Sequence, residues 1–392
     1  MTATWHIITG EYPPQLGGVG DYTERLAAGL AAQGCQVHVW CPHCHGKSPQ
    51  HDRVEVHRIA GGFSSDKLFE LGESLSQFSS PRTILVEYAP NAFAMRGLNI
   101  PFCFWLLGRC LFAKDDVRVM FHEPFFYFGW KRPQRNVLAL VNRLMAVVLL
   151  AASRVVYVST PAWECMLRRY AWFRQPPMVW LPIPTTIPYY ESKEAVSTIR
   201  RERTGGDSEK LILGHFGTYG THMMPDLYQI FVELLQKRAN VLGMCLGARG
   251  DTFVANVLRS HPHLQGRLFA PGFLSRKEVS LHLQACDLII QPYPDGASSR
   301  RTSLMAVLVN GVPTITTLGS LTESIWVESG AVPLVSARDT TAMVALATEL
   351  LEDRNLRKHL GERGRGFYVQ HFSLARSIGI LLQGISLSPG QP

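Results

Sequence analysis

Two adjacent arginines follow a loop of small polar residues and come just before an apolar helical pattern. Arg300 and Arg301 stand after the stretch QPYPDGASS, and a second β-branched strand pattern begins after Gly311. Guanidinium groups bind phosphate oxygens bidentately, and hydroxyls, backbone N–H groups and a helix N-terminus supply further anion ligands. This pattern favours a phosphate or diphosphate site. Pairing of both arginines with surface carboxylates remains the alternative.

Other side chains of this loop are expected to contact the same bound anion or the group attached to it. They are Asp295, Ser298, Ser299, Thr302 and Ser303. Asp295 could bind a sugar hydroxyl, although an aspartate between proline and glycine is equally typical of a turn.

A glycine-rich loop also follows the first predicted strand. Gly17-Gly18-Val19-Gly20 comes after Trp5–Thr9, and we expect the next helix to start near Asp21 as its N-cap. The loop lacks the GxGxxG spacing, and the second predicted strand, Gln36–Cys41, is not followed by a well-placed acidic residue. A nicotinamide enzyme is therefore a poor fit, and an ordinary tight turn is the alternative for these glycines.

A histidine stands at the carboxyl end of another predicted strand. His122 follows Val117–Phe121, and ligands in parallel sheets bind at this end of the strands. The side chain is a candidate active-site group, with a satisfied strand-end histidine as the alternative.

The composition describes a globular chain with a moderate positive charge. Of the 392 residues, 46% are hydrophobic and 18% charged, and the formal net charge is +8. This charge suits an anionic substrate or an acidic membrane surface, whereas no basic run with interleaved aromatic residues supports nucleic-acid binding. The eight dispersed cysteines and the lack of a signal-peptide pattern favour reduced thiols and a cytoplasmic location.

One short cluster, Cys41–His45, places two thiols and two imidazoles close together. A second pair with ligand spacing does not follow it, so we expect no metal site.

Strand and helix patterns alternate in both halves of the chain, which predicts an α/β protein with two tandem Rossmann-like, doubly wound domains facing a cleft. Prolines between Gln175 and Pro188 suit a hinge or extended linker and place the boundary near residue 185. The expected domains are 1–185 and 186–370, followed by a terminal segment, 371–392, with an amphipathic helix over Leu374–Leu387.

Two apolar stretches lie in the first half, Ile100–Ala113 and Arg135–Ala152. Both are too short or too interrupted to span a bilayer. Buried helices are the favoured interpretation, and a surface that lies on a membrane is the alternative.

Over nearly its whole length the chain resembles the GT-B glycosyltransferases, specifically the retaining glycosyltransferase family 4. The motifs that carry the resemblance occur in the family's order. They are Glu11-Tyr12-Pro13-Pro14 with Gly17–Gly20, His122-Glu123, Gly272-Phe273-Leu274, Ala285-Cys286-Asp287 and Asn310-Gly311-Val312-Pro313.

The resemblance implies a GT-B fold in which domain 1–185 binds the acceptor, domain 186–370 binds a nucleotide-diphosphate sugar, and the terminal helix crosses back to the first domain. It implies no metal or other cofactor. It also assigns site residues: the amides of Gly17, Gly18 and Val19 face the donor, and His122 lies near the reacting sugar. The backbone of Phe273 and Leu274 contacts the base, and residues Ser298 to Thr302 surround the diphosphate.

The chain departs from the family pattern at two places. The usual pair of glutamates is replaced by Ser298 and Ala306, which removes the expected ribose contact. An arginine and a lysine after the first strand of the second domain are replaced by residues 217–222, which include Thr218 as a candidate donor contact. We therefore expect Arg300 and Arg301 to supply the missing positive charge.

The expected function is that of a retaining glycosyltransferase acting on an unidentified acceptor, such as a polysaccharide or lipid-linked precursor, at the inner face of the membrane. In the resembled family the departing phosphate takes the acceptor's proton. The alternatives are a non-catalytic nucleotide-sugar-binding protein and a GT-B phosphorylase.

Overall fold

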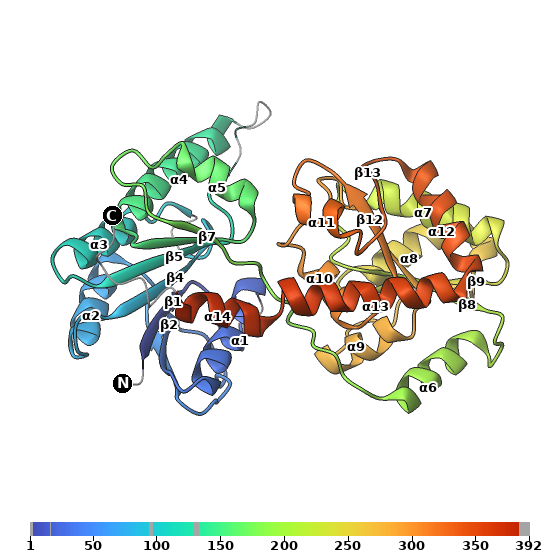
Figure 1. Ribbon diagram of the computed structural model, residues 1–392, viewed down its shortest axis with the longest axis horizontal. Coiled ribbons are helices and arrows are strands. Elements are labelled where there is room, and N and C mark those ends of the chain that lie inside the picture. The colour runs from blue at the N-terminus through green and yellow to red at the C-terminus, as the bar shows by residue number, and fades with distance from the viewer. Residues whose placement is uncertain (1–2, 16, 94–96, 127, 129–132, 384–392) are drawn as a thin grey trace. The chain divides into compact units, whose positions relative to one another are not determined.

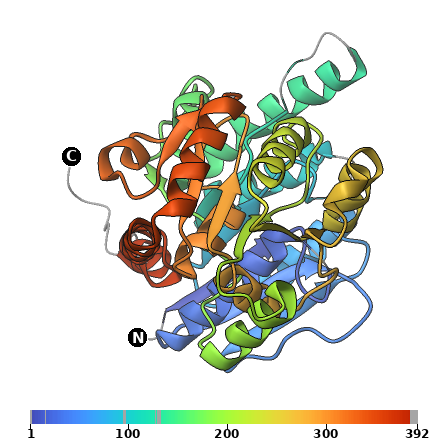
Figure 2. The ribbon, with the colours of Figure 1, turned by 90° about the vertical axis from the view of Figure 1, so that its right-hand side faces the viewer.

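The computed structural model describes residues 3–15, 17–93, 97–126, 128 and 133–383. Their contacts divide the chain into two compact units. The first contains residues up to Ile183 together with the segment from Leu374, and the second contains Pro184–Ser373. Each unit is a parallel sheet with helices on both faces, as Figures 1 and 2 show. The expected α/β class with two doubly wound domains is confirmed.

The first unit has a seven-stranded sheet in the order β3-β2-β1-β4-β5-β6-β7. Its strands are β1 (Thr4–Thr9), β2 (Gln36–Pro42), β3 (Val54–Ile59), β4 (Thr83–Tyr88), β5 (Asp116–Phe121), β6 (Val155–Val158) and β7 (Met178–Trp180). Its helices are α1 (Gly18–Ala32), α2 (Ser65–Ser76), α3 (Ile100–Leu111), α4 (Pro133–Ala152), α5 (Pro161–Arg168) and α14 (Leu374–Gln383). The central strands are buried on both faces, which is why they are apolar runs and not alternating patterns.

The second unit has a six-stranded sheet in the order β10-β9-β8-β11-β12-β13. Its strands are β8 (Leu211–Phe216), β9 (Val241–Leu246), β10 (Leu268–Phe269), β11 (Leu288–Gln291), β12 (Thr314–Leu318) and β13 (Leu334–Ser336). Its helices are α6 (Lys193–Thr204), α7 (Met224–Lys237), α8 (Gly250–Ser260), α9 (Arg276–Gln284), α10 (Thr302–Val309), α11 (Ser324–Ser329), α12 (Thr340–Glu352) and α13 (Arg354–His371). The order reverses at β8, which places a switch point between β8 and β11.

The proline-rich stretch before the boundary is only partly a linker. Met178–Trp180 forms the edge strand β7, because an edge position tolerates neighbouring prolines that cannot donate to a ladder. The terminal helix α14 packs on α1 of the first unit, and a Cβ added at Gly29 would overlap Ile378. Residues 384–387 of the helix expected over Leu374–Leu387 lie outside the described residues.

The charged residue inside the apolar stretch Ile100–Ala113 has a structural role. Arg109 of α3 is 9% exposed, and its Nε donates to an oxygen of buried Asp115 at 2.7 Å. Arg82 donates to the other oxygen of the same carboxylate at 2.6 Å. Within the described part of the chain, no helix combines the length and the apolar character needed to cross a membrane.

Candidate functional site

A cavity of about 690 Å³ lies in the second unit at the carboxyl ends of its central strands. The residues that follow β8 and β9 line it, and so does the loop between β11 and α10. We call this cavity the arginine pocket, because Arg300, Arg301 and Arg338 face into it. Its size is within the range that small-molecule ligands occupy in proteins.

The segments that follow β8 and β9 come close together at two glycines, where a side chain would not fit. Gly247 follows β9 with φ +101°, a backbone conformation that favours glycine. A Cβ at this position would overlap the carbonyl oxygen of Gly217, which follows β8. Helices α7, α8 and α10 begin beside the lining residues, so the positive ends of three helix dipoles contribute to the pocket.

The two arginines that the sequence singles out share one carboxylate. Arg300 donates from Nη2 to Asp295 Oδ2 at 2.8 Å, and Arg301 donates from Nη2 to Asp295 Oδ1. The Arg301 guanidinium also lies over the Tyr293 ring, 4.6 Å from its centroid. The trio carries a net charge of +1 at neutral pH, from two guanidiniums and one carboxylate. Each arginine keeps further N–H groups that a bound phosphate could use.

The surroundings hold the trio in this charge state. Burial alone would raise the pKa of Asp295, but the charges and hydrogen bonds of Arg301 and Arg300 outweigh burial and lower that pKa below its usual value. Burial raises the pKa of the neighbouring Tyr293 to about 12, although the hydroxyl of Ser303 lies 2.7 Å from the Tyr293 hydroxyl. Tyr293 is therefore a neutral phenol in the pocket wall.

A buried glutamate that the sequence did not single out fixes the loop before the arginines. Glu323 is 8% exposed and accepts from the amide of Ser299 at 3.1 Å to each of its oxygens. It also accepts from the Ser299 hydroxyl at 2.6 Å and from Trp326 Nε1 at 2.8 Å. The amide and hydroxyl of Ser299 are therefore engaged inside the unit, and the residue holds the loop in place.

The pocket brings together six of the ten residues of the second unit that were predicted to bind the donor. Those that line it are Thr218, Asp295, Arg300, Arg301, Thr302 and Ser303. Four others are outside its lining: Phe273 is 94% exposed, Leu274 packs against the core, and Ser298 and Ser299 are fully buried. Polar residues of the lining that the sequence did not single out include His222 and Arg338.

Arg338 adds a third positive charge to the wall. It donates from Nη1 to the carbonyl oxygen of His222 at 2.8 Å and to Asp226 at 3.0 Å. Its φ of 73° is unusual for a side chain of this kind, and such conformations persist where surrounding contacts impose them. In the sequence, Arg338 is marked only by its position next to Asp339 after a short strand, and this pattern does not predict a pocket residue.

In the first unit, the glycine-rich loop is closed by a carboxylate from its own unit. Glu11 Oε1 accepts from the amides of Val19 at 2.9 Å and Gly20 at 3.0 Å, and a Cβ at Gly17 would overlap the same carboxylate. Glu11 thus caps α1, which begins at Gly18, and the prediction of Asp21 as the N-cap is wrong. The Val19 amide is engaged in this cap, and its predicted contact with a donor stays a prediction.

The Cβ position of Gly18, by contrast, is open, with nothing within 4 Å. The predicted contacts of Gly17 and Gly18 with a donor stay predictions.

His122 is 7% exposed at the end of β5 and is held by a buried carboxylate. Its Nε2 lies 2.7 Å from Glu87 Oε2, and its ring meets Tyr22 edge-on with centroids 5.3 Å apart. Trp163 Nε1 donates to the carbonyl oxygen of His122 at 3.0 Å. If Nε2 carries the proton that Glu87 accepts, Nδ1 is left as the acceptor that a sugar hydroxyl could use. Its role near a reacting sugar stays a prediction.

The Cys41–His45 cluster forms no compact ligand set among the described residues. Cys41 is buried on β2 and contacts the backbone of the next strand, whereas His43 and His45 are exposed in the loop that follows. The histidine rings lie edge-on with centroids 5.9 Å apart.

Part of the first unit matches a known protein family. Residues 16–180 match the model of Glycosyltransferase Family 4. None of the curated protein sequences matches the chain significantly.

Several solved structures match nearly end to end. Sucrose-phosphate synthase from Thermosynechococcus elongatus has a TM-score of 0.70 at 14% identity, over 98% of this chain and 99% of that one. WaaG, a glycosyltransferase involved in lipopolysaccharide biosynthesis, has a TM-score of 0.66 at 16% identity, over 98% and 100%. Anabaena HepE in complex with UDP and glucose has a TM-score of 0.67 at 12% identity, over 98% and 99%.

At such low identities the structural matches establish the fold, which is GT-B. The match of residues 16–180 adds that the first unit is similar in sequence to glycosyltransferase family 4.

Proposed function

We propose that this chain transfers a sugar from a nucleoside-diphosphate sugar to a hydroxyl acceptor, with retention at the anomeric carbon. The observation that carries the proposal is the arginine pocket itself. Arg300, Arg301 and three helix N-termini converge at the carboxyl ends of β8, β9 and β11, where a diphosphate finds both charge and hydrogen-bond donors. HepE, which shares the fold, has been solved in complex with UDP-glucose.

The pocket would act mainly on the leaving diphosphate. As the glycosidic bond breaks, negative charge grows on the phosphate oxygens, and fixed guanidiniums and helix dipoles stabilise that charge without reorganising. Loss of one such contact costs about 100–1,000-fold in rate. Positioning of acceptor and donor supplies the rest of the acceleration.

Retention without a protein nucleophile agrees with the carboxylates of the pocket. Asp295 is the one carboxylate among the described residues that line it. Both of its oxygens are bound by arginines, and its lowered pKa makes it a weak base and a poor nucleophile. The departing phosphate oxygen is then the base nearest to the acceptor hydroxyl, and the reaction needs no metal ion.

The first unit supports a lipid-linked or membrane-bound acceptor. Helices α3 and α4 pack together and expose six large apolar side chains, with between 47% and 86% of each exposed. They are Phe104, Leu111, Phe112, Val137, Leu140 and Leu144. An apolar surface of this kind can rest on a bilayer and present a cytoplasmic enzyme to its acceptor.

Co-sedimentation with liposomes tests this surface. A Phe112→Ser and Leu140→Ser double variant should bind vesicles less than the wild type, and Val327→Ser, an exposed apolar site in the other unit, should not. Equal binding by all three proteins would contradict the membrane contact.

A panel of nucleotide sugars tests the transfer reaction. The full-length protein is incubated with each donor, and NMR records nucleoside-diphosphate release and the anomeric configuration of the product. Transfer or slow hydrolysis of one donor, with retained configuration, supports the proposal. Binding without turnover indicates a nucleotide-sugar-binding protein, and phosphate-dependent cleavage of a glycoside indicates a phosphorylase. Arg300→Ala and Arg301→Ala should lose turnover, whereas Arg259→Ala on exposed α8 should keep it.

A further inference from the structure

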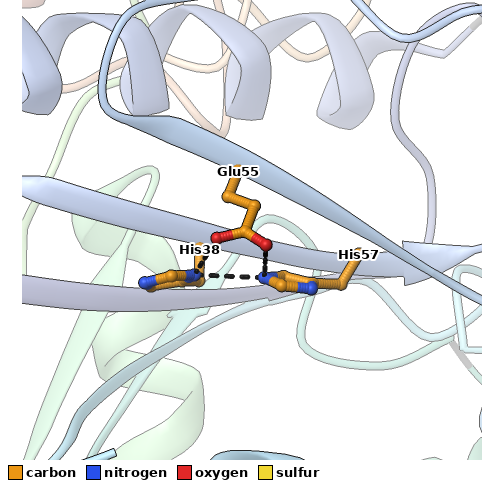
Figure 3. A group of neighbouring side chains, drawn as sticks. All are labelled: His38, Glu55 and His57. Carbon is orange, nitrogen blue, oxygen red and sulfur yellow. Dashed lines mark hydrogen bonds and ion pairs between the residues drawn. The ribbon is translucent and has the colours of Figure 1, made fainter.

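Three side chains that could ligate a metal converge on one face of the first unit's sheet. His38 comes from β2, and Glu55 and His57 come from the neighbouring edge strand β3, as Figure 3 shows. The parallel register pairs His38 with Glu55 and Trp40 with His57, so all four side chains point to the same side.

The distances between the candidate ligand atoms fit a tetrahedral ion. His38 Nδ1 lies 3.0 Å from His57 Nε2 and 3.4 Å from Glu55 Oε2, and His57 Nε2 lies 3.7 Å from Glu55 Oε1. Ligands about 2.0–2.1 Å from a tetrahedral Zn²⁺ stand about 3.4 Å apart. The two N···O distances exceed the range of about 2.7–3.2 Å for a direct hydrogen bond, whereas the two imidazole nitrogens are within hydrogen-bond distance of each other, a contact that a shared ion would replace. The carboxylate is therefore placed better for a shared ion than for either imidazole.

Aromatic neighbours hold the two imidazole rings of the cluster in place. The His57 ring stacks on Trp40 with centroids 4.0 Å apart, and the His38 ring stacks on His6 at 5.2 Å. Stacking fixes both ring planes, and pre-oriented ligands bind a metal more tightly.

We propose that His38, Glu55 and His57 form a Zn²⁺ site with one position open to solvent. Two imidazole nitrogens and one carboxylate oxygen are a ligand set that zinc accepts and that hard cations such as Mg²⁺ do not favour. The side chains of Glu55 and His57 are 60% and 25% exposed, which gives the ion a path to the site and leaves room for a water as the fourth ligand.

A bound ion would fasten the edge of the sheet. β3 is the last strand of the seven and pairs with β2 alone. The ion would join these two strands through side chains and stabilise the first unit by binding only its folded form. The site is separate from the arginine pocket and has no part in the proposed metal-independent transfer.

Zinc binding to the full-length protein, after treatment with EDTA and dialysis, tests the proposal. Titration calorimetry should give one Zn²⁺ per chain with a submicromolar Kd, and Mg²⁺ should not bind. Glu55→Gln changes an exposed side chain and should fold normally. It should weaken Zn²⁺ binding by more than about 100-fold, because even residues that only support a ligand contribute about 10–100-fold. His57→Ala should abolish the binding.

A matched control separates this site from the exposed histidines nearby. The His43→Ala and His45→Ala double variant should bind Zn²⁺ like the wild type and show the same rise in Tm on adding it. Co²⁺ in the wild type should give the intense visible absorption of a tetrahedral site. Stoichiometric binding that survives Glu55→Gln but not the double variant would overturn the proposal, as would an absence of Zn²⁺ binding by the wild type.

Discussion

The charge count of the arginine pocket can be changed one unit at a time. The trio of Arg300, Arg301 and Asp295 has a net charge of +1, which Arg301→Ala reduces to 0 and Asp295→Asn raises to +2. A guanidinium that binds phosphate contributes about 2 kcal/mol, which is about 30-fold in Kd. Arg301→Ala should therefore weaken binding of a nucleoside diphosphate by about 30-fold.

The double variant Asp295→Asn and Arg301→Ala returns the net charge to +1. A carboxylate about 8 Å from a bound phosphate opposes it by about 2 kcal/mol at an effective dielectric constant of about 20. The three side chains are 22–27% exposed, so solvent screening reduces this value, and we expect about tenfold recovery over Arg301→Ala alone.

Titration calorimetry measures the Kd of UDP, ADP and GDP for the wild type, the two single variants and the double variant. Arg259→Ala serves as the control for a lost surface arginine. If Asp295→Asn binds more weakly than the wild type, and the double variant more weakly than Arg301→Ala alone, Asp295 does more than oppose the phosphate charge. Such a result would refute the reasoning, because it would mean that Asp295 contacts the ligand or positions Arg300.

Three further predictions concern stability. Burial lowers the pKa of His215 from 6.5 in the unfolded chain to about 4 in the folded chain. The neutral imidazole therefore does not reduce the unfolding free energy above pH 6.5. As the pH falls towards 4, the unfolded chain binds a proton more readily, and about 3 kcal/mol of unfolding free energy is lost. Urea unfolding of the wild type at pH 7 and pH 4 should show this loss, and His215→Gln should reduce it. Gly17→Ala should lower the unfolding free energy by about 2 kcal/mol, because the added Cβ displaces the Glu11 carboxylate that caps α1. Gly18→Ala should not, because no atom lies within 4 Å of the position of its Cβ. Glu323→Gln should lower the unfolding free energy by about 2 kcal/mol and raise the donor KM, since the loop before Arg300 loses its anchor. An unchanged KM would mean that the loop keeps its shape without the carboxylate.

The fold could be predicted from the sequence because hydrophobic periodicity and glycine positions determine where each strand and helix begins and ends. Strand runs such as Gln36–Cys41 and Val117–Phe121 formed where the pattern indicates. Since strand ends of a parallel sheet meet at one edge, the loops after β8, β9 and β11 also met as expected.

Contacts between distant segments were beyond the reach of pattern reasoning. The sequence left open whether Arg300 and Arg301 pair with carboxylates, and both pair with Asp295 of their own loop. Glu11 caps α1 from outside the helix, which displaced the predicted N-cap at Asp21. No local signal marks Glu323 as an anchor, because it meets Ser299 only through the pairing of β11 with β12, the parallel strands that these two residues follow.

The proposed zinc site likewise depends on residues that are distant in the sequence. The sequence drew attention to the thiols and imidazoles of Cys41–His45, which are adjacent in the chain. The structure instead gathers His38, Glu55 and His57, whose proximity depends on the register between β2 and β3. Register is set by the buried faces of several strands together and cannot be deduced from one strand's composition.

A crystal structure of the full-length protein with a bound nucleoside diphosphate would show directly whether the arginine pocket binds the donor. Both phosphates should lie in the arginine pocket, with oxygens about 2.7–2.9 Å from guanidinium nitrogens of Arg300 or Arg301. A nucleotide bound elsewhere, with no phosphate oxygen within hydrogen-bond distance of Arg300 or Arg301, would contradict this role of the two arginines.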